Sequence, residues 1–374
     1  MMSKRALLVI TGAFAYSGGI AASTRLAIRA LLDAGYELDI FAFNETPDAA
    51  NKYAALPGVR YHAGNNAKLG FALMVWWAGL TRRYAFAFSD HINVASILAP
   101  LAWLRLVRYI VRVHLIEAVA PNPDAQGRLG LRAAWRIHAS EFARAEVRKA
   151  FPDLQIEVVP LALDPDTHFD LPALPLTQMK LQAVDGQERA LGERVVLLVG
   201  RMAAGEQYKG QDVLIRSLSL ILERCPDVQL VLAGHGDDYP RLLALAHSLP
   251  AAVQERVFMP GYVSADQLET LYRTCAVFAM PSRGEGFGVV YLEAMRWAKS
   301  CVATRADAAQ FIVEHEQTGL LVDDPQDERE VAAALLRLLT DPALAQAYGQ
   351  AGYERVRRLY SFDQFRARFI EALT

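Results

Sequence analysis

The chain has 374 residues, more than one ordinary hydrophobic core encloses, which suits two domains of roughly 150 to 200 residues each. Hydrophobic residues make up 53% and charged residues 21%, so the composition excludes a disordered chain. The net charge of -2 gives no bulk attraction for nucleic acid. Residues 1–113 nevertheless carry twelve Lys and Arg against six Asp and Glu, so the N-terminal part is locally basic.

Cysteine usage and hydropathy indicate a cytoplasmic protein. Cys225, Cys275 and Cys301 are odd in number and lack Cys-x-x-Cys spacing, which argues against a disulfide framework or a zinc cluster. The apolar stretch after the basic start is too short for the apolar region of a signal peptide. No stretch reaches the roughly 18 uninterrupted apolar residues of a spanning helix.

In the first half of the chain, short aliphatic runs alternate with helical patterns. Strands are predicted at 6–11, 37–43, 84–89, 108–114 and 156–163, with a helix through 24–35. Uncharged aliphatic strands of this kind are buried on both faces, as in a parallel sheet.

Near residue 165 the alternation breaks into a proline-containing stretch, which predicts a linker over 166–190. The alternation then resumes. Strands are predicted at 194–200, 228–234, 276–282, 300–305 and 318–324. The pattern therefore predicts two successive doubly wound α/β domains, in which ligands bind outside the carboxyl ends of the strands.

The stretch PSRGEGFGVVYLEAM carries two glutamates, Glu285 and Glu293, on a predicted strand-loop-helix element whose helix starts near Phe287. The amides at this helix start favour an anion such as phosphate. Eight helical residues would place both carboxylates on one side of the helix, about 12 Å apart, which suits hydroxyl groups at two ends of one extended ligand. The alternative is a carboxylate at the helix start and a solvated residue on the helix face.

Cations follow the first strand of the second domain. The stretch VLLVGRMAAGEQYKGQD supplies Arg201 and Lys209 near the end of that strand, where two cations suit a diphosphate. A Walker A loop is excluded, because Glu206 and Gln207 stand where Lys and Ser or Thr are needed. The Gly-x-Gly of VLAGHGDDYPRL lacks the third glycine of a dinucleotide-binding fingerprint.

These segments together resemble the retaining glycosyltransferases of family 4, which have the GT-B fold. The matching pieces, in the family's order, are SGGIAASTRLAIRALLDAGYELDIF, VGRMAAGEQYKGQDVLI, LAGHGDD, FMPGYVSADQLETLYRTCAVFAMPSRGEGFGVVYLEAM and TGLLVDDPQD. The resemblance covers nearly the whole chain and is strongest over 194–325. It implies two doubly wound Rossmann-like domains with a cleft between them.

The resemblance also implies domain roles. Residues 1–165 would form an acceptor-binding domain, to which the C-terminal helix within 358–374 would return. Residues 191–357 would form the domain that binds the nucleotide-sugar donor. The structural alternative for the last helix is simply the final helix of the second domain.

Individual roles follow by position. The resemblance assigns the donor diphosphate to Arg201 and Lys209, the ribose hydroxyls to Glu293, and the nucleobase to the backbone at Tyr262 and Val263. The other implied site residues are Gly234 and the segment Glu285, Gly286, Phe287 and Gly288 for the donor, Gly18 and Gly19 at the cleft, and His114 near the reacting sugar. Of all these, His114, Glu285, Arg201 and Lys209 form the expected catalytic set, and a structural histidine is the alternative for His114.

The chemistry that the resemblance implies is same-face attack by an acceptor hydroxyl while the donor phosphate departs and takes the proton. Cations stabilise the charge that develops on the diphosphate, so no metal and no cofactor are expected. Asp164-Pro165-Asp166 imitates a metal-binding Asp-x-Asp but is ordinary turn chemistry. The chain departs from the family's pattern at TRADAAQF (304–311), where a glycine pair and a glutamate are usual, and at VPLALD near 160.

Two apolar stretches of the first domain combine tryptophans with arginines. These residues are Trp76, Trp77, Trp103, Arg82, Arg83, Arg105, Arg108 and Arg112. Such a combination suits contact with anionic lipid at the inner face of the plasma membrane, and the alternative is core packing.

The sequence thus predicts a metal-independent, retaining hexosyltransferase of polysaccharide biosynthesis that acts at the cytoplasmic side. Its donor would be a UDP- or GDP-linked sugar, and its acceptor a hydroxyl of a glycan or lipid-linked glycan. Two alternatives stay open, a GT-B nucleotide-sugar epimerase and a non-catalytic partner that binds a nucleotide sugar.

Overall fold

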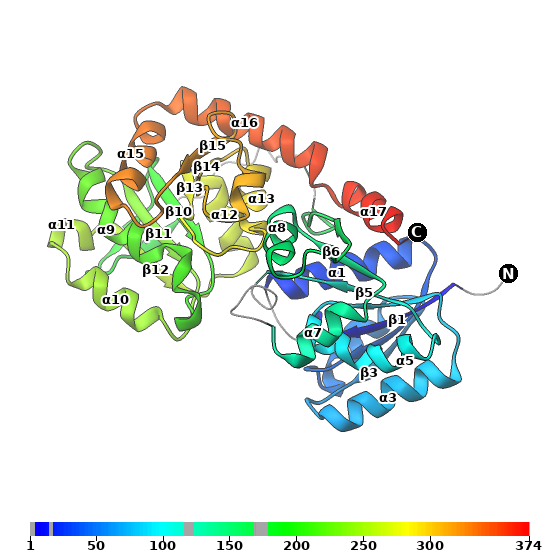
Figure 1. Ribbon diagram of the computed structural model, residues 1–374. Coiled ribbons are helices and arrows are strands. Elements are labelled where there is room, and N and C mark those ends of the chain that lie inside the picture. The colour runs from blue at the N-terminus through cyan, green and yellow to red at the C-terminus, as the bar shows by residue number, and fades with distance from the viewer. Residues whose placement is uncertain (1–3, 15–17, 116–122, 168, 170–178, 374) are drawn as a thin grey trace. The chain divides into compact units, whose positions relative to one another are not determined.

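The chain divides into two compact units (Figure 1). In the computed structural model, residues 4–14, 18–115, 123–167, 169 and 179–373 are described. Unit 1 comprises Met1–Thr167 with Tyr360–Thr374, and unit 2 comprises His168–Leu359. Each unit has one parallel sheet with helices around it, so the chain alternates strand and helix as its hydrophobic pattern predicts.

Unit 1 is built on a seven-stranded sheet in the order β3-β2-β1-β4-β5-β6-β7. Its strands are β1 (Arg5–Ile10), β2 (Glu37–Ala42), β3 (Val59–Ala63), β4 (Phe86–Ser89), β5 (Tyr109–Arg112), β6 (Arg136–Ala139) and β7 (Ile156–Val158). Its helices are α1 (Gly19–Asp33), η1 (Pro47–Ala49), α2 (Ala50–Ala54), α3 (Lys68–Thr81), α4 (Ile92–Ala95), η2 (Ser96–Leu98), α5 (Ala99–Trp103), α7 (Ala125–Arg132), α8 (Glu141–Ala150) and α17 (Phe362–Glu371). Every pairing in this sheet is parallel, and helical crossovers connect its successive strands.

Unit 2 has a six-stranded sheet in the order β12-β11-β10-β13-β14-β15. Its strands are β10 (Val195–Val199), β11 (Gln229–Ala233), β12 (Val257–Gly261), β13 (Val277–Ala279), β14 (Ser300–Thr304) and β15 (Gly319–Val322). Its helices are η3 (Ala204–Lys209), α9 (Gln211–Leu222), α10 (Tyr239–His247), α11 (Ala251–Gln254), α12 (Ala265–Thr274), α13 (Val289–Arg296), α14 (Ala309–Ile312), α15 (Glu328–Leu339) and α16 (Pro342–Leu359). The central strand β10 is almost wholly buried because helices cover both faces of the sheet.

The last helix, α17, packs against α1 of unit 1. Phe365 and Phe369, four residues apart, lie on its buried face. The ring of Phe369 meets Phe88 of β4 edge to face at 5.7 Å and His138 of β6 at 5.5 Å. This apolar contact holds the C-terminal segment in unit 1, although α16 before it belongs to unit 2.

The expected linker over 166–190 is wrong in its second half. Residues Lys180–Gln182 (β8) and Glu188–Ala190 (β9) pair as an antiparallel hairpin. Gly186 has φ 86° at its turn, a conformation that glycine adopts without strain. Ala183 bridges to Phe258 of β12, so the hairpin is part of unit 2. Residues 170–178 lie outside the described residues.

Candidate functional site

The candidate donor site lies at the carboxyl edge of the unit 2 sheet. Strand order reverses there, because β10 is followed on one side by β11 and on the other by β13. In a doubly wound sheet the loops that follow these central strands diverge and leave room for a ligand. The loops after β10 and β13 contain Arg201 and Glu285, respectively.

Glycines bring the loops of this edge into direct contact. A side chain at Gly234, where φ is 145°, would lie 1.9 Å from the carbonyl oxygen of Gly200. One at Gly236 would lie 2.1 Å from the carbonyl oxygen of Met202, and one at Gly210 would lie 2.4 Å from that of Pro281. Three successive loops therefore touch backbone to backbone, which only glycine permits.

The two predicted cations meet on one carboxylate. Glu206 of η3 forms ion pairs with Arg201 and, at 3.1 Å, with Lys209. Burial raises the pKa of Glu206, but the two cations more than offset this, and its pKa is lowered overall. The Lys209 side chain lies over Gly200, with its Cδ 3.5 Å from the position of an added Cβ. The cations are thus held side by side at the end of β10.

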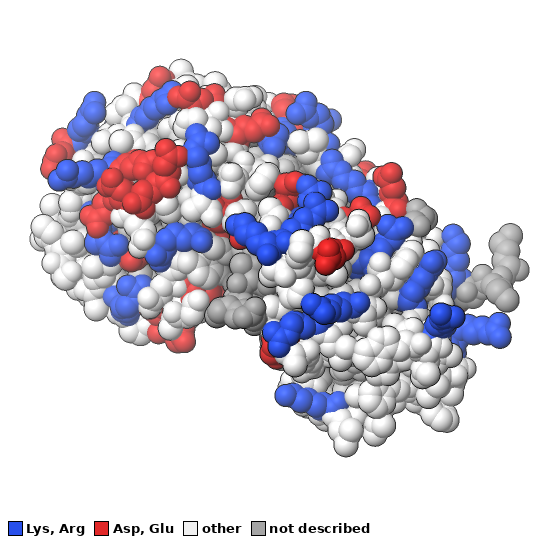
Figure 2. All heavy atoms as spheres, viewed as in Figure 1, with Lys and Arg blue, Asp and Glu red and all other residues white. Residues whose placement is uncertain are grey.

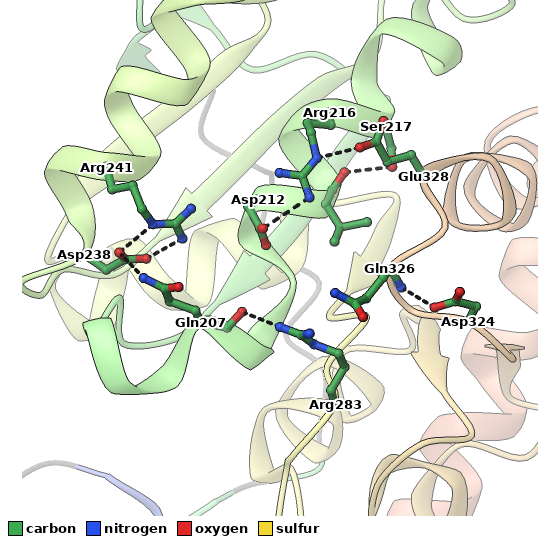
Figure 3. A network of polar contacts seen from close by, with 11 residues as sticks. Gln207, Asp212, Arg216, Ser217, Asp238, Arg241, Arg283, Asp324, Gln326 and Glu328 are labelled. Carbon is green, nitrogen blue, oxygen red and sulfur yellow. Dashed lines mark hydrogen bonds and ion pairs between the residues drawn. The ribbon is translucent and has the colours of Figure 1, made fainter.

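Neighbouring loops fix η3 on two sides (Figure 3). The Gln207 side chain donates to Asp238 at 3.0 Å, and Asp238 is itself held by two hydrogen bonds of 2.7 Å from Arg241. The carbonyl oxygen of Gln207 accepts a hydrogen bond from Arg283 at 3.4 Å. The segment that carries Glu206 and Lys209 is thereby tied to the loops after β11 and β13.

Glu285 lies in the loop after β13, and burial raises the pKa of its carboxyl group. Among the residues that the structure describes, no hydrogen-bond partner reaches its Oε2. Lys209 and Glu206 both act on this carboxyl through their charge, Lys209 lowering its pKa and Glu206 raising it. Glu285 is therefore a half-buried carboxyl group with an unbonded Oε2, within reach of the Lys209 charge.

Sequence reasoning assigned no role to Asp307, which organises this loop. Its carboxylate accepts hydrogen bonds from the Ser282 hydroxyl, from the Glu285 amide at 2.9 Å and from the Ala309 amide at 2.9 Å. Burial raises the pKa of Asp307 to about 6. The sequence did offer a signal for Asp307, because this acid follows the buried strand β14 closely and has alanines on both sides.

The predicted helix start near Phe287 is wrong. Helix α13 begins at Val289, with Gly288 at φ 89° as its N-cap, so Glu285 and Gly286 precede the helix. The helical spacing predicted for Glu285 and Glu293 therefore does not apply. An added Cβ at Gly288 would lie 2.7 Å from the Tyr291 ring, which explains why the chain turns here through a glycine.

Glu293 lies on α13 with a defined partner. The Tyr272 hydroxyl of α12 donates a hydrogen bond of 2.6 Å to its Oε2. Burial raises the pKa of Glu293, although the bond from Tyr272 acts in the opposite direction. Glu293 is therefore a positioned acceptor rather than a solvated surface residue.

The segment expected near the nucleobase follows β12. The Tyr262 side chain is 83% exposed, and Val263 is half-buried. Gly261 before them lies against the His235 ring of the loop after β11, and its carbonyl oxygen accepts a hydrogen bond from the Gly234 amide at 2.9 Å. Gly234, Tyr262 and Val263 thus belong to the same edge as the cations.

The remaining predicted residues, Gly18, Gly19 and His114, are in unit 1. Gly18 is the N-cap of α1 with φ 135°, and Gly19 is the first residue of that helix. His114 lies two residues beyond β5 and forms a hydrogen bond with the Asp90 backbone. Burial and the nearby Arg112 charge lower the pKa of His114 to about 3, so its imidazole is neutral at physiological pH.

The sequence pointed to no metal, and the described part of the chain contains no group of three or more His, Cys, Asp or Glu side chains that could hold one.

Comparison with known proteins finds similarity in the part of the chain that contains this edge. Residues 193–341 match the family model described as Glycosyl transferases group 1. The GDP-mannose-dependent alpha-(1-6)-phosphatidylinositol monomannoside mannosyltransferase of Mycobacterium tuberculosis is 32% identical over 243 residues, 63% of this chain and 60% of that protein. The D-inositol 3-phosphate glycosyltransferase of Corynebacterium urealyticum is 32% identical over 201 residues, 51% of this chain and 46% of that protein. The chain thus spans 60% or less of the length of these curated relatives.

Solved structures show the same fold over the full chain. Sucrose-phosphate synthase from Thermosynechococcus elongatus superposes with a TM-score of 0.75 at 22% identity and covers 99% of this chain and 98% of its own. Alr3699/HepE of Anabaena in complex with UDP superposes with a TM-score of 0.77 at 18% identity and covers 99% of both chains. Residues 193–341 are therefore similar to the glycosyl transferases group 1 family, and the chain has the GT-B fold that the sequence predicted.

Proposed function

We propose that this protein is a retaining glycosyltransferase that moves a hexose-type sugar from a UDP- or GDP-linked donor to a hydroxyl of a glycan or lipid-linked glycan. Such a reaction serves cell-envelope or exopolysaccharide synthesis, and we place it in the cytoplasm. The named relatives support this class, because one is described as GDP-mannose-dependent and one solved neighbour binds UDP.

One observation carries the donor assignment, namely the convergence of Arg201 and Lys209 on the Glu206 carboxylate at the end of β10. This arrangement is already complementary to an anion with oxygens that face two cations. In the donor complex the diphosphate oxygens take the place of the Glu206 carboxylate. The Glu293 carboxylate, held by Tyr272, accepts hydrogen bonds from the ribose hydroxyls.

The proposed reaction needs little acid-base chemistry from side chains. The bond between the anomeric carbon and the donor phosphate oxygen breaks, the acceptor oxygen bonds to that carbon from the same face, and the acceptor proton passes to the leaving phosphate. Arg201 and Lys209 stabilise the charge that grows on the leaving diphosphate, and no metal takes part. Glu285 holds a hydroxyl group of the transferred sugar, and the role of His114 near the reacting sugar stays a prediction from the sequence.

The two alternatives predict different chemistry. An epimerase of this fold needs a pair of acid-base groups at one sugar carbon. At the described donor edge, Arg201 and Lys209 instead pair with Glu206, and Glu293 is bonded by Tyr272. A non-catalytic partner would bind the nucleotide sugar without turnover. This alternative stays in the test because the chain departs from the family's pattern at 304–311, the stretch that contains Asp307.

The experiment is a thermal-shift and calorimetric screen of UDP, GDP, ADP and their sugar conjugates in the presence of EDTA. We expect one nucleotide to stabilise the protein, Lys209→Ala to weaken that binding at least tenfold, and Arg224→Ala, an exposed cation elsewhere in unit 2, to leave it unchanged. Transfer to an acceptor glycan is then followed by NMR of the product's anomeric configuration. Binding without transfer or hydrolysis favours the non-catalytic partner, and no binding of any nucleotide rejects the donor site.

A further inference from the structure

Unit 1 carries a surface that its own fold leaves uncovered. On α3, Phe71, Val75 and Ala78 face the core, whereas Leu73 and Trp77 on the opposite side are 54% and 70% exposed. The large exposed apolar side chains of α3 are Leu69, Leu73, Met74, Trp77 and Leu80. A surface helix normally turns a polar face to water, so this apolar face needs another explanation.

A second group extends the same surface. Helix α5 packs on α3 where an added Cβ at Gly79 would overlap Leu101, and the Trp76 ring nitrogen donates to the Ile97 carbonyl oxygen at 2.8 Å. Just beyond α5, Trp103, Leu104 and Leu106 are 67%, 66% and 44% exposed. We call the exposed residues of α3 together with these three the apolar face. Figure 2 shows largely uncharged atoms over α3 and α5, with basic side chains beside them.

The charge around the apolar face has one sign. Residues 64–115 contain six Lys and Arg and a single acid, Asp90, which is fully buried. Lys68, Arg83, Arg105 and Arg108 are exposed. Arg82 and Arg112 do not contribute, because Arg82 pairs with Asp39 at 2.7 Å and Arg112 is buried.

A hollow of about 400 Å³ borders the face on its basic side. Its lining includes Leu106 of the apolar face together with Arg105, Arg108 and Trp135. The Arg108 guanidinium lies 3.9 Å from the Trp135 ring centre and is thereby positioned. Arg105 has φ 57°, a left-handed conformation that is strained for a residue other than glycine. Glycine would adopt this backbone conformation with less strain than Arg105 does.

We propose that the apolar face docks unit 1 on the surface of an anionic lipid bilayer, with Trp77, Trp103 and their neighbours in the interfacial layer and Arg83, Arg105 and Arg108 against lipid phosphates. Bulky apolar and aromatic residues rimmed by cations are the composition of interfacial binding. No helix among the described residues is long and apolar enough to cross a membrane. This inference does not depend on the proposed transfer reaction.

The test is co-sedimentation of the full chain with vesicles of phosphatidylcholine alone and of phosphatidylcholine mixed with phosphatidylglycerol. We expect binding to the anionic vesicles with a blue shift of tryptophan fluorescence, weak binding to the neutral ones, and loss of binding as salt is raised. The variant Leu73→Gln/Trp77→Gln/Trp103→Gln should lower the partition coefficient at least tenfold, because three exposed side chains lose their apolar contact.

A second variant tests the charge without harming the fold. Arg83→Gln/Arg105→Gly removes two cations and relieves the left-handed arginine, so we expect unchanged or higher thermal stability. Partitioning should fall about fivefold per charge, the factor that corresponds to about 1 kcal/mol. The matched controls in unit 2 are Phe311→Gln and Arg224→Gln/Arg329→Gln, which should partition like the unchanged protein.

Three results would overturn the proposal. One is failure of the unchanged protein to sediment with anionic vesicles at low salt. Another is equal sedimentation of the apolar-face variants and the unit 2 controls. The third is a dimer in light scattering that the apolar-face substitutions dissociate, which would assign the face to a second copy of the chain.

Discussion

The Asp307 carboxylate accepts a hydrogen bond of 2.9 Å from the backbone N–H of Glu285. A residue from the loop after β14 thereby positions the loop after β13, where the expected catalytic glutamate lies. The charge of the Glu285 carboxyl group also raises the pKa of Asp307, which burial already raises. Residues 304–311, where the chain departs from the family's usual residues, therefore contribute Asp307 to the structure of the donor edge.

Replacing Asp307 should loosen the donor edge. Asp307→Ala removes the acceptor of the buried Ser282 hydroxyl and of two amides, so we expect the free energy of unfolding to fall by about 3 kcal/mol. Asp307→Asn keeps one carbonyl oxygen and should lose less. Urea denaturation measures both, with the 81% exposed carboxylate of Asp323→Asn as control. Equal stability of Asp307→Ala and the control would contradict the positioning role.

The same residue predicts a pH dependence of stability. Burial raises the pKa of folded Asp307 to about 6 from 3.8, so between these values the folded chain holds more protons than the unfolded chain. The free energy of unfolding should therefore decrease as pH rises from about 4 to 6, by up to about 3 kcal/mol from this group. In Asp307→Asn this part of the decrease should disappear. An identical pH profile in the variant and the unchanged protein would show that Asp307 titrates normally.

Replacing Glu206 should strengthen the binding of the nucleoside diphosphate. Its carboxylate occupies the cations that we assign to the donor diphosphate, so the nucleotide must displace it. In Glu206→Gln this competition is weaker, and we expect the dissociation constant for the nucleoside diphosphate to fall about fivefold, since removing a paired charge is worth about 1 kcal/mol. Calorimetry at low salt measures this, with exposed Glu223→Gln as control. Weaker binding in Glu206→Gln would mean that Glu206 orients the cations for the ligand instead.

The sequence predicted the class of the fold because the central strands of both sheets are uncharged and aliphatic. It missed β3, β6, β12 and the hairpin of β8 and β9, and for β6 and β12 the reason is physical. The β6 segment RIHA carries Arg136 and His138, and β12 contains Pro260, which its position at the edge of the sheet tolerates. These strands are defined by pairing with their neighbours rather than by their own hydrophobic pattern.

The sequence pointed to the residues of the candidate site but not to the side chains that bond to them. Four predicted residues lie in the loops at the carboxyl edge of the sheet or in the helix that follows, namely Arg201, Lys209, Glu285 and Glu293. Their positions after predicted strands made this location expected. Glu206, Tyr272 and Asp307 hold them, and none follows from spacing, because each reaches its partner through tertiary packing. The predicted start of α13 was wrong because the sequence does not show which of the two glycines beside Phe287, Gly286 or Gly288, precedes the first helical residue.

The glycine contacts predict a large difference between two similar substitutions. Gly234→Ala would place a methyl group 1.9 Å from the Gly200 carbonyl oxygen at φ 145°, so the loops after β10 and β11 must separate. We expect a loss of at least about 3 kcal/mol, from strain together with displaced backbone hydrogen bonds. Gly205→Ala in η3 meets nothing within 4 Å and should be neutral or slightly stabilising. Similar melting temperatures for the two variants would contradict the close packing of these loops.

The pair formed by Tyr272 and Glu293 allows the ribose assignment to be separated from a structural role. Glu293→Gln keeps an acceptor for the buried Tyr272 hydroxyl, which donates at 2.6 Å, whereas Tyr272→Phe removes the donor and leaves the carboxylate in place. If Glu293 binds ribose hydroxyls, Glu293→Gln should weaken nucleotide binding about tenfold, because hydrogen bonds to a charged acceptor are worth about 1.5 kcal/mol or more. Tyr272→Phe should weaken it less, through poorer positioning alone.

A double-mutant cycle of these two substitutions, measured by calorimetry with the nucleoside diphosphate and with its 2′-deoxy analogue, completes the test. The unchanged protein should discriminate against the deoxy analogue, and Glu293→Gln should lose that discrimination while its melting temperature stays near that of the unchanged protein. If the discrimination survives in Glu293→Gln, another group reads the ribose, and the bond from Tyr272 to Glu293 only joins α12 to α13. If only stability changes, in proportion to the loss of the hydrogen bond, the role of Glu293 is structural.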